Sequence, residues 1–203
     1  MDKLFKGGLI LVAILIGYMI FESFVYLASA QNVTVTATVT TTVTCTLSTT
    51  TTAFGTIDTS AVFTSSPNVT TTVSCNPASG CQVQINDTGS GSQPGLWNSG
   101  ASFLIPSPNA AFSATATLVA GTKGYGIQAT TTTAGSGSTL TLNSRYNQTG
   151  NTVGGLTTTT IQLASSTSPT ANREVVVTHK AAIDNLTPAG NYQDTITYNC
   201  VSN

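Results

Sequence analysis

Strict two-residue alternation in residues 33–47 constrains the fold of this chain more than any other feature. Because successive side chains of a β-strand point to opposite faces, the pattern predicts one long strand with an apolar face and a threonine-rich face. The predicted apolar face consists of Val33, Val35, Ala37, Val39, Val43, Cys45 and Leu47. Strands of globular proteins usually have about 3 to 10 residues. We therefore expect the first part of this strand to extend beyond its own domain and to end on a neighbouring copy.

The first 30 residues have the layout of a secretory signal. Lys3 and Lys6 give a basic start, residues 7–20 form an uninterrupted apolar stretch, and small residues end at Ala30. Such a layout is typical of a segment that is removed on export. We expect cleavage after Ala30.

Two other interpretations of the leader stay open. Residues 7–27 are nearly apolar and long enough for an uncleaved membrane anchor, although Glu22 falls within that span. A type IV pilin leader could begin at Lys6, but residues 8–16 contain no acid where such leaders carry a glutamate.

The composition favours an all-β protein outside the cell. Charged residues make up 6% of the chain, against a typical value near 25%. A nucleic acid is therefore excluded as a partner, because phosphate binding needs clustered lysine and arginine. The 40 threonines all follow residue 30, and threonine favours strands while offering a hydroxyl group to water.

Four cysteines, an even number, are expected to form disulfides in an oxidising compartment. Cys75 and Cys81 stand at the two ends of a short NPASG segment between alternating runs, so we expect a hairpin with a bond between them. Cys45 would then pair with Cys200 and tie the first strand to the last. The alternative pairing, Cys45 with Cys75 and Cys81 with Cys200, stays open.

Alternation and Gly, Pro or Asn punctuation predict further strands after the first. We expect them at residues 61–64, 68–75, 81–85, 103–105, 112–119, 125–132, 139–143, 157–163, 173–183 and 192–201. Long loops are expected at 87–100 and 144–155. The prediction is a single antiparallel β-sandwich over residues 43–203, preceded by an N-terminal extension over residues 31–42.

The two ends of the chain resemble the spore coat protein U and archaic chaperone-usher pilin group. The resemblance rests on Cys45, AFGT at 53–56, VTTTVSC at 69–75 and PAGNYQDTITY at 188–198. It implies a secreted immunoglobulin-like or jelly-roll-like sandwich that polymerises when the N-terminal strand of one subunit completes the sheet of the next. Residues 33–39 would then be the donor strand. The middle of the chain is similar to uncharacterised secreted β-rich bacterial proteins.

The inventory of reactive residues speaks against an enzyme. His179 is the only histidine and shares parity with Val177, so we expect it to face inward. A Ser-His-Asp arrangement with Asp184 or Asp194 stays open, although no GxSxG motif accompanies it. Glu174 is the only glutamate after residue 30, and the cysteines lack CxxC spacing. We expect no catalytic, cofactor or metal site.

Trp97 is the residue most suggestive of a ligand contact. It lies in a long polar loop, where an aromatic ring could stack on a sugar, with Tyr125 and Tyr146 as possible companions. The alternative, which we favour, is that its ring folds back over one end of the sandwich.

Two hypotheses therefore remain. The first is a structural surface protein that assembles with copies of itself. The second is a monomeric carbohydrate-binding or adhesin module that contacts surface glycans. In either case the membrane is a partner only through an uncleaved leader.

Overall fold

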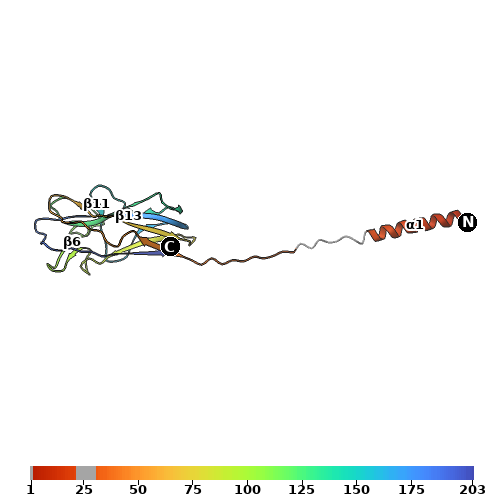
Figure 1. The fold of residues 1–203 in the computed structure, drawn as a ribbon, viewed down its shortest axis with the longest axis horizontal. Coiled ribbons are helices and arrows are strands. Elements are labelled where there is room, and N and C mark those ends of the chain that lie inside the picture. The colour runs from red at the N-terminus through yellow and green to blue at the C-terminus, as the bar shows by residue number, and fades with distance from the viewer. Residues whose placement is uncertain (1, 22–30) are drawn as a thin grey trace. The chain divides into compact units, whose positions relative to one another are not determined.

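The computed structural model describes residues 2–21 and 31–203, which divide into two units, one ending at Val39 and one spanning Thr40–Asn203 (Figure 1). The first unit contains the helix α1 (Asp2–Phe21). Within the described ranges, no helix is both long and apolar enough to cross a bilayer. The expected cleavage site at Ala30 lies outside the described residues.

The second unit is a sandwich of antiparallel sheets (Figure 1). The larger sheet has the order β1 (Val43–Leu47), β3 (Val69–Cys75), β13 (Thr170–Ala182), β8 (Gly124–Thr131), β11 (Thr152–Gly154), β7 (Thr115–Thr117), with β2 (Phe63–Thr64) and β9 (Ser136–Gly137) also on β13. The smaller sheet has the order β10 (Thr141–Leu142), β12 (Ile161–Ser165), β4 (Cys81–Asp87), β14 (Ile196–Ser202). A separate ribbon pairs β5 (Gly95–Asn98) with β6 (Phe103–Pro106).

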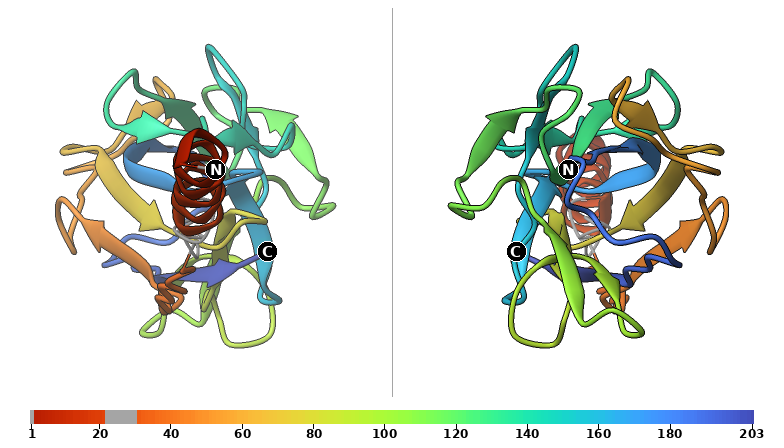
Figure 2. Two further views of the ribbon diagram at one scale, coloured as in Figure 1. Left: turned by 90° about the vertical axis from the view of Figure 1, so that its right-hand side faces the viewer. Right: turned by 90° about the vertical axis from the view of Figure 1, so that its left-hand side faces the viewer.

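The core consists of inward side chains from strands of both sheets, and Figure 2 shows these strands nearly end-on. Strands β3 and β4 both alternate strictly between buried and half-buried residues, as their sequences predict. Val73 of β3, Val83 of β4 and Val177 of β13 have no exposed surface. The alternation therefore sets which side chains fill the core.

The long N-terminal strand is only partly formed. Of residues 33–47, only Val43–Leu47 pair, along β3, while residues 31–42 have no regular secondary structure. Alternation fixes which face a side chain takes, but a strand also needs a neighbour for its backbone hydrogen bonds. Asn76 bonds the backbone of Thr42 (3.1 Å) and Thr40 (2.8 Å), but residues 31–39 have no hydrogen-bonded neighbour among the described residues.

The expected hairpin at Cys75 and Cys81 is wrong, although the two expected disulfides are present. Cys75 ends β3 in the larger sheet and Cys81 begins β4 in the smaller one, so their bond crosses the core between sheets. Cys45 of β1 bonds Cys200 of β14 and links the sheets again, at one edge. The alternation of each strand predicts only that these cysteines face inward. Cys75 and Cys81 can face inward in a hairpin or in a connection between the two sheets, so alternation does not distinguish the two.

Several expected boundaries also need correction. The loops expected at 87–100 and 144–155 contain β5 and β11, and the strand expected at 157–163 begins only at Ile161. These short strands carry glycine or lack alternation, so their sequences resemble loops. Their partners, distant in sequence, hold them in the fold.

Two disulfides indicate an oxidising, extracytoplasmic environment for the protein.

Candidate functional site

A groove of about 890 Å³ lies at one edge of the sandwich, between the edge strands β1 and β14. Its two walls come from opposite ends of the chain: residues 47–57, the N-terminal wall, and residues 187–198, the C-terminal wall. Apolar side chains contribute much of its lining: Leu47, Phe54, Ile57, Leu96, Ile183 and Ile196. The lining does not reach the Cys45–Cys200 bond, which joins β1 to β14 just beyond the groove.

The C-terminal wall presents a free strand edge to the groove. Gln193 exchanges two backbone hydrogen bonds with Trp97 (2.8 and 3.0 Å), and the carbonyl oxygen of Thr195 accepts one from the N–H of Thr88 (3.0 Å). Residues from Ile196 onward continue this pairing along β4. Backbone groups alternate sides along a strand, so those of even-numbered residues such as Asp194 point the other way, toward the groove.

The side chains of the C-terminal wall follow the same alternation. Tyr192, Asp194, Ile196 and Tyr198 are half-buried and line the groove, whereas the odd-numbered residues between them are exposed. The wall therefore offers both a row of inward side chains and an unused set of backbone groups. These are the two features that an added strand needs.

Aromatic rings form part of the groove floor. Tyr125 of β8 is buried, stacks on the His179 ring at 6.4 Å between centroids and meets the edge of Phe54 at 6.2 Å. Burial lowers the pKa of His179 to about 4, so the ring is neutral at physiological pH. Burial also raises the pKa of Tyr125 well above its usual value.

Two carboxyl groups meet behind this floor. Asp87 is 1% exposed, and its Oδ2 accepts a hydrogen bond from the Gly95 N–H (3.0 Å), while Oδ1 of Asp194 accepts from Gly89 (3.2 Å). Burial, followed by the hydrogen bond and negative charge of Asp194, raises the pKa of Asp87 to about 9. Asp87 is therefore protonated at neutral pH and can donate its proton to Asp194. Sequence reasoning missed this pair, although the alternation of residues 81–87 already places Asp87 inward.

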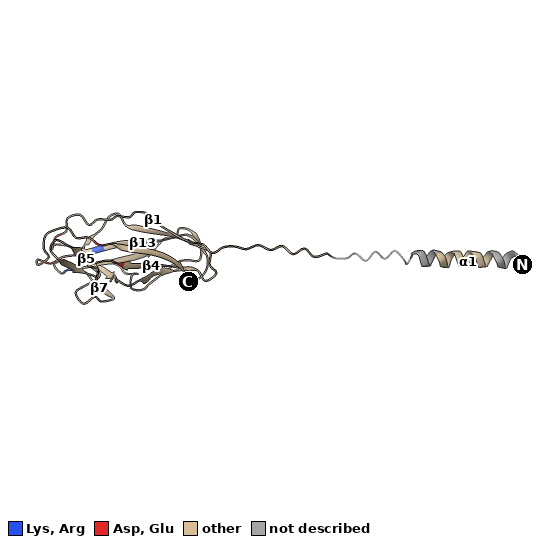
Figure 3. Cartoon of the chain, turned by 90° about the horizontal axis from the view of Figure 1, so that it is seen from below, with Lys and Arg blue, Asp and Glu red and all other residues tan. Residues whose placement is uncertain are grey.

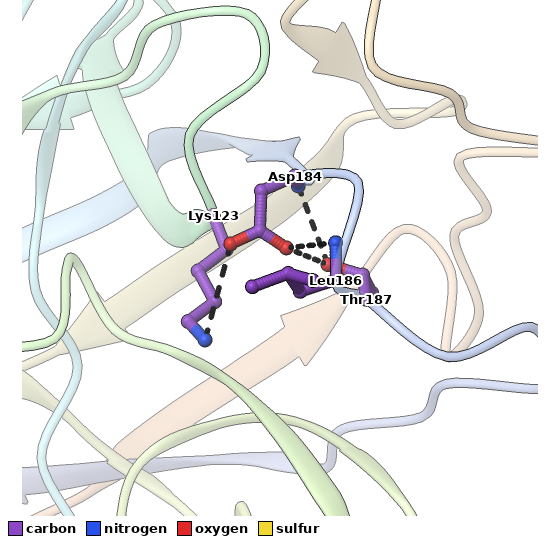
Figure 4. A network of polar contacts seen from close by, with 4 residues as sticks. All are labelled: Lys123, Asp184, Leu186 and Thr187. Atoms are coloured by element: carbon purple, nitrogen blue, oxygen red, sulfur yellow. Dashed lines mark hydrogen bonds and ion pairs between the residues drawn. The ribbon is translucent and has the colours of Figure 1, made fainter.

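The groove's C-terminal wall is anchored where it leaves β13. Oδ1 of Asp184 accepts hydrogen bonds from the Thr187 hydroxyl (2.8 Å) and the Leu186 N–H (3.1 Å), and its Oδ2 lies 4.0 Å from Lys123 Nζ (Figure 4). The same ammonium group lies 4.9 Å from the centre of the Phe103 ring. Exposed ion pairs contribute little free energy, so these contacts mainly set the course of the turn.

The expected donor residues are exposed. Val33, Val35 and Val39 have exposed fractions of 83% to 88%, and Ala37 is exposed as well. Apolar side chains that alternate so regularly are usually buried on one face. These residues thus form an exposed apolar face with the periodicity of a strand.

Trp97 does not lie in a loop. It is half-buried in β5, opposite Leu104 of β6, and its backbone braces the C-terminal wall at Gln193. The expected companions Tyr125 and Tyr146 are 3% and 0% exposed, so they cannot form a sugar platform with it. Both belong to the core: Tyr125 lies on β8, and Tyr146 lies in the turn after β10 with its ring directed inward.

His179 faces inward, as its parity predicts, with an exposed fraction of 5%. Its Nδ1 lies 3.4 Å from the hydroxyl oxygen of Ser65, which is 3% exposed. A hydroxyl held this deeply is poorly placed to meet a substrate. Few segments of the cartoon in Figure 3 are blue or red, because only 6% of the residues are charged.

Comparison of the sequence with protein-family models and with curated proteins gave no match.

Proposed function

We propose that this protein is a non-enzymatic structural subunit of a cell surface, which assembles when residues 31–42 of one copy enter the groove of the next. One observation carries the proposal. The same chain has an exposed, alternating apolar segment without a partner strand, and a groove with an apolar lining and a free strand edge. The finer fold assignment, an immunoglobulin-like or jelly-roll-like sandwich, belongs to the same proposal.

The free energy available to such an assembly is substantial. Burying Val33, Val35 and Val39 would contribute about 1.5 to 3 kcal/mol each before the cost of ordering the segment. Pairing with β14 would also satisfy backbone groups on both sides. An exposed strand edge otherwise invites uncontrolled association.

The path of the chain favours a groove on another copy. The carbonyl oxygen of Thr40 accepts a hydrogen bond from the Asn76 side chain (2.8 Å), at the end of β1 remote from the groove. The Cys45–Cys200 bond lies between that exit and the groove, with 6.1 Å between the two Cα atoms. A strand inserted between two neighbours needs about 9.6 Å, twice the usual spacing. The segment therefore cannot run straight back into its own groove.

Deletion of residues 31–40 tests the proposal. The deletion removes only Thr40 from the compact unit Thr40–Asn203, so we expect a folded protein that no longer oligomerises. A synthetic peptide of residues 31–40 should bind it. Light scattering over a wide concentration range, with circular dichroism to check folding, measures both outcomes.

Paired substitutions give a matched control. Val35→Asp with Val39→Asp should reproduce the deletion, because both carboxylates would enter the apolar groove. Thr34→Asp with Thr38→Asp adds the same charge to the outward face and should preserve assembly. A wild-type protein that stays monomeric while residues 31–40 are protected from hydrogen exchange would contradict the proposal.

A further inference from the structure

We infer that the entering segment runs antiparallel to β14, with Val33 opposite Tyr198, Val35 opposite Ile196, Ala37 opposite Asp194 and Val39 opposite Tyr192. The inference rests on the proposed function and adds the direction and register of the inserted strand. Three features of the groove determine them: its closed end, its free edge and the parity of its C-terminal wall.

The closed end sets the direction. The groove stops beside the Cys45–Cys200 bond, and its other end, near Tyr192, has no such bridge. In the donor copy only residues 40–42 separate the segment from β1 at Val43. So short a connection cannot turn around the bridge, so residue 40 must lie at the open end. Because β14 runs from the open end toward Cys200, the two strands are antiparallel.

The free backbone edge of the C-terminal wall determines which donor residues point into the groove. Even-numbered residues of the C-terminal wall direct both their side chains and their unused backbone groups toward the groove. In an antiparallel pair, directly opposite residues share a face. The inward donor residues must therefore lie opposite even-numbered wall residues. A shift by one residue would turn every valine toward water.

The number of positions sets the register. Four inward donor residues, at 33, 35, 37 and 39, meet four inward wall residues, at 192, 194, 196 and 198. The next inward wall position, Cys200, is occupied by its disulfide. The smallest donor side chain, Ala37, then faces the only carboxyl group among the four, Asp194. A larger apolar side chain at this position would lie against that polar group.

Pairs of cysteines on the outward face test the register. Directly opposite outward residues in this arrangement are Thr34 with Thr197 and Thr38 with Gln193, at exposed positions whose Cα atoms should lie about 4.5 Å apart. Full-length Thr34→Cys/Thr197→Cys and Thr38→Cys/Gln193→Cys variants should give ladders of covalent multimers on non-reducing gels. If the two partner positions are exchanged, the Cα atoms of each pair lie more than about 7 Å apart in this register, so those variants should give little or no ladder.

The exchanged variants, Thr34→Cys/Gln193→Cys and Thr38→Cys/Thr197→Cys, are matched controls with the same four positions. Stronger ladders from them would indicate a parallel strand and overturn the inference. A dominant ladder from Thr34→Cys/Thr195→Cys would indicate a slipped register and overturn it as well. Multimers in light scattering without any ladder would place the segment away from β14. A wild-type protein that forms no multimers would instead contradict the proposed function itself.

Discussion

At the residue scale, burial keeps both Asp87 and His179 uncharged, and it shifts their pKa values in opposite directions. The pKa of Asp87 rises from 3.8 to about 9 because of burial and the neighbouring Asp194, so the folded protein holds its proton more tightly than the unfolded chain. The pKa of His179 falls from 6.5 to about 4 because of burial, so the folded protein binds that proton less tightly. Each shift makes the free energy of unfolding depend on pH.

The two dependences oppose one another between pH 4 and 6.5. In this range, the contribution of Asp87 to the free energy of unfolding falls as the pH rises, while that of His179 grows. Each changes by about 1.4 kcal/mol per pH unit at most. Above pH 6.5 the histidine is neutral in both states and only the loss from Asp87 continues. We therefore expect the stability of the wild-type protein to decline by about 3 kcal/mol between pH 6.5 and 9.

Asp87→Asn should remove this alkaline decline, because the amide cannot ionise and can still donate a hydrogen bond to Asp194. Urea unfolding at pH 5, 6.5 and 9 measures the effect, and below pH 6.5 the variant should show the rise that His179 produces. Asp58→Asn, at a fully exposed carboxylate, should keep the wild-type decline. Equal alkaline slopes in the wild type and the Asp87 variant would contradict the assignment.

At the element scale, the junction between β8 and β11 depends on close backbone approach. The strands meet through Gly154 and Ile127, and a Cβ atom on Gly154 would fall on the Tyr146 ring and the Arg145 carbonyl group. Tyr146 has no exposed surface, and its hydroxyl donates to the Gly155 carbonyl oxygen at 3.2 Å. The ring therefore cannot move aside easily.

Gly154→Ala should lower the free energy of unfolding by about 1 to 3 kcal/mol, the usual effect of overpacking a core. Gly100→Ala is the matched control, since its Cβ would lie 3.5 Å from the nearest atom, Oδ1 of Asn98. Chemical denaturation of both variants provides the measurement. A Gly154 variant as stable as the Gly100 variant would show that the junction can relax.

At the scale of the whole molecule, both disulfides join the two sheets but close loops of very different length. The Cys45–Cys200 bond spans 155 residues of sequence and the Cys75–Cys81 bond spans 6. On the chain-entropy model the long loop stabilises the fold by about 5 kcal/mol and the short one by about 2 kcal/mol. The long cross-link also closes the groove at one end.

Replacing Cys45 and Cys200 by alanine should therefore lower the free energy of unfolding more than replacing Cys75 and Cys81. We expect a difference of about 3 kcal/mol between the two double variants. Urea denaturation under non-reducing conditions measures it. Equal losses would mean that strain or residual structure in the unfolded chain outweighs the length of the loop.

The sequence by itself determined the facing of side chains along each strand. Alternation placed His179 inward on β13 and put Cys75 and Cys81 on inward faces. The even cysteine count predicted disulfides, while their pairing was predicted from a hairpin that the fold does not contain. Alternation also accounts for the inward position of Asp87. These are local properties, because the two-residue period of a strand depends only on its own backbone.

Only the tertiary structure decided which strands are neighbours. It put β3 and β4 in different sheets, left residues 31–42 out of both sheets, and opened a groove between segments more than a hundred residues apart in sequence. It also buried Tyr125 and Tyr146 and brought Asp87 to Asp194. Such neighbours depend on long-range packing between sheets, and a period-two pattern is compatible with many partners for every strand.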